Sequence, residues 1–198
     1  SHAQEQLWFL HQLGASSAYT VPAAFDIVGE LDATALRSAL QVLVERHSVL
    51  RTEFADEAGT PVAVVRPAVP VVLPVVDLGP GEPELRLALA ERCTQPLQLD
   101  GPVRLHATLF RRGASSHLLL LLFHHIVVDG LSVQVLLDEL PVAYRAARAG
   151  VPCELPPAPS FADHVRAERQ RSGDHDDERH VAFWLDYLAG MEEFELPA

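Results

Sequence analysis

The sequence predicts an α/β (α+β sandwich) fold, in which helices pack on a sheet. Residues 118–123 form a continuous apolar run, which is typical of a strand covered on both faces or of a buried helix segment. The short length of the run favours the strand. Residues 103–110 alternate between apolar and polar side chains, and a turn at 113–116 joins them to the run, so these strands should pair antiparallel. An amphipathic pattern at 33–46 supplies a helix that can cover the sheet.

In the first half of the chain, caps and turn residues set the element boundaries. Asp32 precedes the amphipathic stretch and should cap its helix. Trp8, Phe9 and Leu10 should pack the first helix against the rest of the domain. The predicted elements are a helix at 1–13, a strand at 23–28, a helix at 33–46, a strand entered through 46–54 and a second hairpin arm at 62–65.

Prolines interrupt the pattern in the second half. Pro70 and Pro74 limit residues 69–76 to an edge strand at best. Pro141 should kink or split the helix at 131–149, because proline lacks the N–H that a helix interior needs. The other predicted segments are helices at 84–94, 161–171 and 178–188, a Pro-rich connector at 150–160 and an exposed loop at 172–178.

Composition limits the class of protein. The chain has 198 residues, 48% of them hydrophobic, which is enough for one sizeable core or one large lobe. Its formal net charge of -12 argues against nucleic acid as a partner, because that binding depends on Lys and Arg. No apolar run approaches the roughly 20 residues of a membrane span, and no signal peptide is visible, so we expect a soluble, cytoplasmic protein. The first residue is Ser, from which we expect a longer parent polypeptide.

The two cysteines give little further information. Cys93 and Cys153 lie far apart and form no C-x-x-C pair. Isolated cysteines fit a reducing compartment, although the sequence leaves a disulfide between them open.

A histidine pair follows the apolar run. His124 and His125 stand at the expected strand end, and Asp129 and Gly130 follow at a turn into a helix. Because neighbouring strand residues point to opposite faces, one histidine should face the packed layer and the other an opening. A metal site is disfavoured, since the two side chains diverge and no H-x-H or H-x-x-x-H spacing is present. Two hypotheses stay open: structural histidines with Asp129 as a helix cap, or acid–base catalysis by an imidazole that titrates near pH ~6.5.

Several stretches together resemble one family. FHHIVVDGLS resembles the H-H-x-x-x-D-G signature of the condensation domains of nonribosomal peptide synthetases. SHAQEQLWFL at 1–10 is similar to the family's first motif, S-x-A-Q-x-R-L-W-x-L, and RHSVLRTEF at 46–54 is similar to its second, R-H-E-x-L-R-T-x-F. SFADHV at 160–165 and FWLDYLAG at 183–190 resemble later segments of the first lobe.

The sequence departs from the family's motifs at two positions, and it lacks one of the family's later motifs. Gln6 stands where the first motif has Arg, and Ser48 stands where the second has Glu; both weaken local ion pairing. The family's later motif V-G-x-F-V-N-T does not occur. The resemblance therefore implies that residues 1–198 are the N-terminal lobe of a two-lobed, chloramphenicol acetyltransferase-like domain, without its C-terminal lobe. It also implies a mixed, largely antiparallel sheet flanked by helices.

The resemblance also implies roles for residues of the site. His125 matches the functional second histidine, which either removes a proton from the acceptor amine or orients that amine and stabilises the intermediate. His124 is then structural. Gly130 gives the backbone room at the turn, and its N–H could help to hold a charged intermediate.

The aspartate of the signature is expected to be structural. The resemblance implies that Asp129 pairs with an arginine. Arg46 and Arg51 are the candidates in this chain, unless the partner lies in the C-terminal lobe.

The implied reaction is peptide-bond formation between a donor peptidyl or acyl thioester and an acceptor aminoacyl thioester. Both substrates are carried on phosphopantetheine arms of carrier domains, and an adjacent adenylation domain is a further partner. No metal or bound cofactor is implied.

Three alternatives were weighed against this function. One is another acyltransferase with the same signature that uses a coenzyme A thioester, and the first two motifs argue against it. The second is an epimerization domain, which the first motif fits less well. The third is a non-catalytic lobe that recruits carrier domains or enzymes; the intact His125 and Asp129 argue against it.

Overall fold

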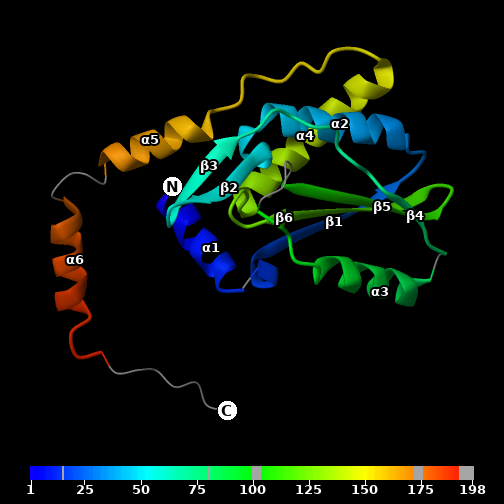
Figure 1. Ribbon diagram of the computed structural model, residues 1–198. Helices are drawn as coiled ribbons and strands as arrows, with labels where there is room; N and C mark the ends of the chain where they lie inside the picture. The colour runs from blue at the N-terminus through cyan, green and yellow to red at the C-terminus, as the bar shows by residue number, and fades with distance from the viewer. Residues whose placement is uncertain (15, 80, 100–103, 172–175, 192–198) are drawn as a thin grey trace. The chain divides into compact units, whose positions relative to one another are not determined.

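A four-stranded sheet in the order β1-β6-β5-β4 is the centre of the larger of two units, residues 2–158 (Figure 1). The strands are β1 (Thr20–Val28), β4 (Val75–Asp77), β5 (Leu105–Gly113) and β6 (Ser116–His124). β6 pairs antiparallel with β1 and with β5, whereas β4 runs parallel to β5. The sheet is therefore mixed and largely antiparallel, as predicted. The computed structural model describes residues 1–14, 16–79, 81–99, 104–171 and 176–191.

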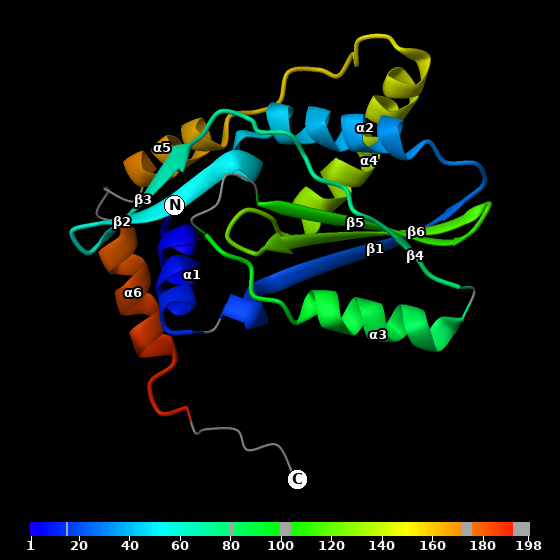
Figure 2. The same ribbon diagram turned by 45° about the vertical axis from the view of Figure 1, so that its right-hand side comes forward.

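Helices cover both faces of this sheet. α2 (Ala33–Arg46) and α4 (Gly130–Ala149) lie on one face, and α3 (Glu82–Cys93) lies on the other (Figures 1 and 2). This arrangement confirms the predicted sandwich. Asp32 caps α2 through hydrogen bonds from the backbone N–H groups of Thr34 and Ala35.

The central strand β6 divides its side chains between two hydrophobic cores. All of its residues from His117 to His124 are buried, which confirms a strand covered on both faces. Leu119, Leu121 and Phe123 join the core that contains residues of α2 and α4. Leu118, Leu120 and Leu122 pack with the cluster that contains Leu85 of α3. Burying side chains of this size stabilises the fold by about 1.5–3 kcal/mol each.

Smaller elements complete the larger unit. They are α1 (His2–Gln12), the 3-10 helices η1 (Ser16–Tyr19) and η2 (Ser48–Arg51), β2 (Thr52–Glu57) and β3 (Thr60–Val65). β2 and β3 form the predicted antiparallel hairpin. Its turn contains Ala58 at φ 54° and Gly59 at φ 84°, a conformation that glycine adopts without strain.

Some expectations differ from the structure. α4 continues through Pro141, so the predicted split is wrong; buried Leu140 and Ala143 anchor the helix on both sides of the proline. Trp8 is buried as expected, but Phe9 is 58% exposed, so its predicted packing is wrong in the described part of the chain. Cys93 and Cys153 are both free thiols.

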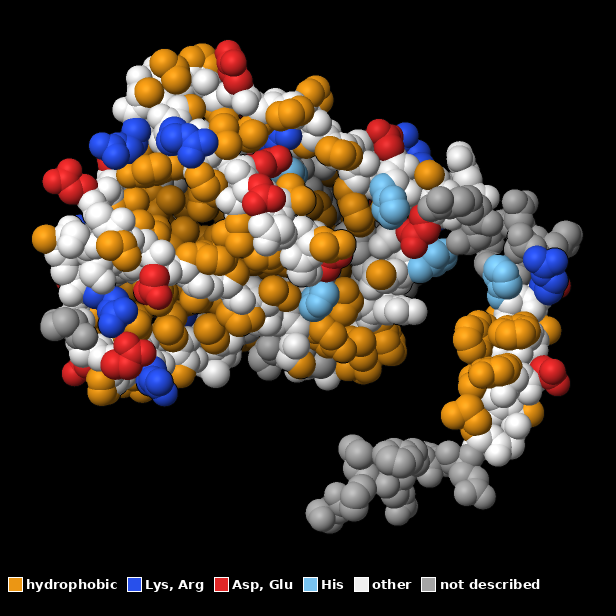
Figure 3. All heavy atoms as spheres, turned by 180° about the vertical axis from the view of Figure 1, so that it is seen from behind, with side chains coloured by type: hydrophobic (Ala, Val, Ile, Leu, Met, Phe, Trp, Pro, Cys, Tyr) orange, Lys and Arg blue, Asp and Glu red, His pale blue; other side chains and the backbone are white. Residues whose placement is uncertain are grey.

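The smaller unit contains α5 (Phe161–Arg171) and α6 (Asp176–Tyr187). Because α6 begins at Asp176, the end of the exposed loop expected at 172–178 is helical instead, and 172–175 lie outside the described residues. Apolar side chains of α6 and the turn after it are uncovered in the described chain (Figure 3): Val181, Phe183, Trp184, Leu185, Tyr187, Leu188 and Met191. No described helix combines the length and apolarity that crossing a membrane requires.

Candidate active site

The two histidines of the signature differ in exposure. His124 is the last residue of β6 and is 1% exposed, whereas His125 is exposed in the turn that follows. The backbone N–H of Val127 closes this turn on the carbonyl of His124 at 3.0 Å. The N–H of His125 donates to the carbonyl of Tyr19 at 2.8 Å. The turn thus presents one imidazole to solvent and packs the other inside.

Both ring nitrogens of His124 have partners. Its Nδ1 accepts a hydrogen bond from the backbone N–H of Ile126 at 3.1 Å, and its Nε2 lies 3.3 Å from Nδ1 of His11. Because Nδ1 accepts, we assign the proton to Nε2. Burial, followed by the charges of His11, Arg104 and His125, lowers the pKa of His124 to about 4. His124 is therefore neutral at pH 7 and has no free nitrogen for a substrate.

His125 has the opposite properties. Its imidazole is exposed, and no side-chain hydrogen bond to another described residue holds it. An exposed imidazole in a turn can meet a substrate amine.

Asp129 caps helix α4. Its Oδ1 accepts hydrogen bonds from the backbone N–H of Ser132 at 2.7 Å and from the Ser132 hydroxyl at 2.6 Å. These two bonds lower the pKa of Asp129, the hydroxyl having the larger effect, and the charge of His125 adds a smaller contribution. These hydrogen bonds support the hypothesis that Asp129 is a structural helix cap.

The expected arginine partners of Asp129 lie elsewhere. Arg46 Nε pairs with Glu139 Oε1 at 3.0 Å, and Arg51 Nη1 donates to the carbonyl of Arg66 at 2.7 Å. Neither pairs with Asp129 among the described residues, so the expectation that Arg46 or Arg51 is its partner is wrong. Glu139 is the competing carboxylate: it lies on the face of α4 that meets the end of α2, and it also contacts His47 Nε2 at 2.6 Å.

Gly130 is the first residue of α4. A Cβ placed there would meet none of the described atoms within 4 Å, and the residue does not adopt a positive φ. The expectation that the turn needs glycine for room is therefore wrong among the described residues. The role of its N–H stays a prediction.

We expect Asp129→Ala to lower stability by about 1 kcal/mol, because the N-cap acceptor is lost. That corresponds to a melting temperature about 2–4 °C lower. Folding lowers the pKa of Asp129, so its stabilisation is present above the unfolded-state pKa and is lost as pH falls through the folded-state value. The difference between wild type and variant should therefore shrink in thermal unfolding at acidic pH.

Asp129→Asn is the matched control, since its side-chain oxygen can still accept from Ser132. It should be more stable than Asp129→Ala at pH 7. A fully stable but inactive Asp129→Ala would instead assign Asp129 a part in the chemistry.

Three residues at this site have no role in the sequence-based prediction. Gln4 donates from Nε2 to the carbonyl of Ile126 at 3.1 Å, and His11 contacts His124. Arg104 is buried and its charge acts on His124. Gln4 and His11 stand seven positions apart on a predicted helix, so they lie on the same face of it. That shared face is the feature of the sequence that could have indicated a joint contact.

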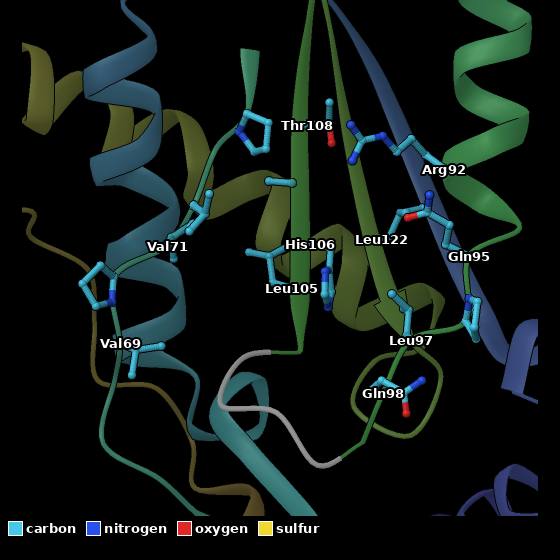
Figure 4. A pocket seen from close by; sticks show the side chains of 15 residues that line it. Val69, Val71, Arg92, Gln95, Leu97, Gln98, Leu105, His106, Thr108 and Leu122 are labelled. Carbon is cyan, nitrogen blue, oxygen red and sulfur yellow. The ribbon is translucent and has the colours of Figure 1, made fainter. Parts of the chain in front are cut away.

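A cavity of about 460 Å³ lies at the edge of β5, away from this turn. Figure 4 shows His106 and Thr108 along the strand, with Val71 on one side and Gln95 on the other. None of the predicted site residues lines it. The imidazole of His125 is instead exposed on the turn that follows β6.

Comparison with known proteins identifies relatives along the whole chain. The family model described as "Condensation domain" matches residues 1–198. The chain is 40% identical over 200 residues to the probable non-canonical nonribosomal peptide synthetase CymA of Salinispora arenicola, covering 96% of the chain and 2% of that protein. It is 38% identical over 205 residues to chondramide synthase cmdD of Chondromyces crocatus, covering 100% of the chain and 5% of that protein.

Solved structures show the same likeness. The first condensation domain of the calcium-dependent antibiotic synthetase, in complex with a substrate analogue, superposes with a TM-score of 0.86 at 29% identity, covering 96% of this chain and 47% of that one. The X-domain from teicoplanin biosynthesis gives 0.86 at 32% identity, covering 98% and 44%. The chain thus spans less than half of these solved chains and a small fraction of the synthetases. With its signature turn, its sandwich fold and a family match from end to end, the chain belongs to the condensation domain family.

Proposed function

We propose that this chain is the N-terminal lobe of a condensation domain that forms peptide bonds in a nonribosomal peptide synthetase. The amine of an acceptor aminoacyl thioester attacks the carbonyl of a donor acyl or peptidyl thioester. The amine loses a proton, the C–S bond breaks, and the donor's thiol is released in protonated form. The single observation that carries the proposal is the exposed His125 beside a buried, neutral His124, in a chain of this family.

His125 contacts the acceptor amine in this proposal, as general base or as the hydrogen-bond partner that orients it. His124 and Asp129 hold the turn, one from the core and one from the start of α4. The substrates arrive on phosphopantetheine arms of donor and acceptor carrier domains, with an adenylation domain in the same cytoplasmic synthetase. The names of the relatives as peptide synthetases support these partners.

A C-terminal lobe completes the site in this proposal. The solved relatives are about twice the length that the chain covers, which leaves room for a second lobe.

The test is reconstitution of the intact two-lobed protein with separately loaded donor and acceptor carrier domains. Mass spectrometry should detect the dipeptidyl product on the acceptor carrier. The same assay with coenzyme A thioesters should give little product. Efficient use of the coenzyme A substrates would favour the alternative acyltransferase.

A second candidate function is recruitment of a partner enzyme. The chain is 32% identical to the X-domain from teicoplanin biosynthesis, and that X-domain has also been solved as a complex with OxyB. A two-lobed protein that lacks condensation activity but retains a partner enzyme in a pull-down would support this alternative.

The 198-residue chain alone should turn over carrier-bound substrates at less than about one hundredth of the rate of the two-lobed protein. Without the second lobe, the exposed turn can neither position both thioesters nor exclude water, and loss of positioning costs on the order of a hundredfold or more. Single-turnover assays of both proteins at equal concentration measure the ratio. Comparable rates would show that this lobe carries a complete site.

A further inference from the structure

Helix α1 makes two side-chain contacts with the turn that carries His125. Gln4 is 8% exposed, and its Nε2 donates to the carbonyl of Ile126 at 3.1 Å. His11 places its Nδ1 at 3.3 Å from Nε2 of His124, with the two rings edge to face at 5.2 Å between centroids. The two residues are seven positions apart, which is two helical turns, so both lie on the face of α1 that meets the turn. All four residues belong to the larger unit.

The hydrogen bonds around His124 allow one arrangement of protons. The N–H of Ile126 donates to Nδ1 of His124, which therefore carries no proton. The proton on Nε2 of His124 then points to Nδ1 of His11, which must accept it. A buried N–H without an acceptor is costly, so the acceptor on His11 helps to fix the tautomer and the orientation of the inner ring.

The same bonds hold the exposed histidine between two fixed neighbours. His124 is fixed by its ring, and Ile126 is fixed through both its N–H and its carbonyl. The backbone N–H of His125 is in turn held by the carbonyl of Tyr19. The direction of the His125 side chain therefore depends on contacts that begin on α1.

We propose that His11 is a positioning residue for the reaction: its Nδ1 accepts the Nε2–H of His124 and so fixes the turn that presents His125 to the acceptor amine. This inference deepens the proposed function and rests on it. His11 acts through His124 and is not a catalytic residue.

The test compares two substitutions in the intact two-lobed protein. His11→Phe keeps a flat ring against His124 but removes the acceptor, whereas His11→Asn places a side-chain oxygen near the position of Nδ1. We expect His11→Phe to lower kcat by roughly ten- to a hundred-fold with KM little changed, as for a slightly misplaced catalytic group. His11→Asn should recover most of that loss at a similar melting temperature.

A second readout does not require turnover. In protein with ¹⁵N-labelled histidine, the Nε2–H proton of His124 should give a slowly exchanging signal in wild type and in His11→Asn, and lose that protection in His11→Phe. If His11→Phe fails to fold, His11→Leu takes its place.

The outcomes separate the inference from the proposed function. Wild-type turnover in His11→Phe, or an Asn variant as impaired as the Phe variant, would overturn the role of His11 while condensation by the wild type stands. If the wild type does not condense at all, the proposed function fails. The spectroscopic comparison then decides whether the His11–His124 hydrogen bond exists.

Discussion

Replacing His125 by alanine in the intact two-lobed protein should remove nearly all condensation, a loss of about 10²- to 10⁴-fold. His125 presents the only exposed imidazole of the signature turn, and His124 cannot substitute for it. The pKa of His124 is lowered to about 4 and both of its ring nitrogens are engaged. Single-turnover transfer from donor to acceptor carrier, followed by mass spectrometry, measures the effect.

The control is His106→Ala, which removes another exposed histidine of the same unit from strand β5. It should leave turnover within about twofold of wild type, since exposed substitutions away from a site are usually mild. Wild-type turnover by His125→Ala would remove the catalytic assignment.

His125→Gln separates the two proposed roles: it can still orient the amine by a hydrogen bond, but it cannot take a proton. Substantial activity in that variant would favour orientation.

Sequence patterns predicted those parts of the fold that depend on local chemistry. The continuous run at 118–123 identified a strand covered on both faces, because such a strand needs no polar side. Asp32 marked the start of α2 because its side chain bonds to N–H groups two and three residues further on. Pro141 did not split the helix, since α4 continues from Gly130 to Ala149 through the proline; a kink at Pro141 stays a prediction.

For the candidate site, too, local properties were predictable from the sequence, whereas contacts between distant residues were not. The predicted difference in exposure between His124 and His125 is confirmed, but its cause is not strand alternation: His124 ends β6, and His125 lies in the turn after it. The partner of Arg46 was not predictable, because it depends on how α4 lies against α2. Glu139 lies 93 positions away from Arg46 in the chain. The contact of His11 with His124 spans 113 positions and likewise needs the packed structure.

Arg104 gives the largest stability effect that we expect. It stands among the polar positions of the alternating stretch at 103–110, yet it is 2% exposed. Its Nε donates to the carbonyl of Thr52 at 2.7 Å and its Nη1 to that of Gln98 at 2.6 Å, while Nη2 donates to the carbonyl of Leu99. The guanidinium thereby joins the start of β5 to β2 and to the loop after α3.

Arg104→Met should lower the free energy of unfolding by about 3–5 kcal/mol, because three carbonyls lose their donor while the apolar stem is kept. The melting temperature should fall by about 10 °C. Arg111→Met, in β5, is the matched control: Arg111 is half exposed and pairs at 3.0 Å with an exposed Asp77, so its loss should cost about 1 kcal/mol or less. Arg104→Lys keeps the charge but not the planar guanidinium group, so its free energy of unfolding should lie between those of the other two variants. Equal unfolding midpoints for Arg104→Met and Arg111→Met in urea would show that the buried guanidinium contributes no more than a surface ion pair.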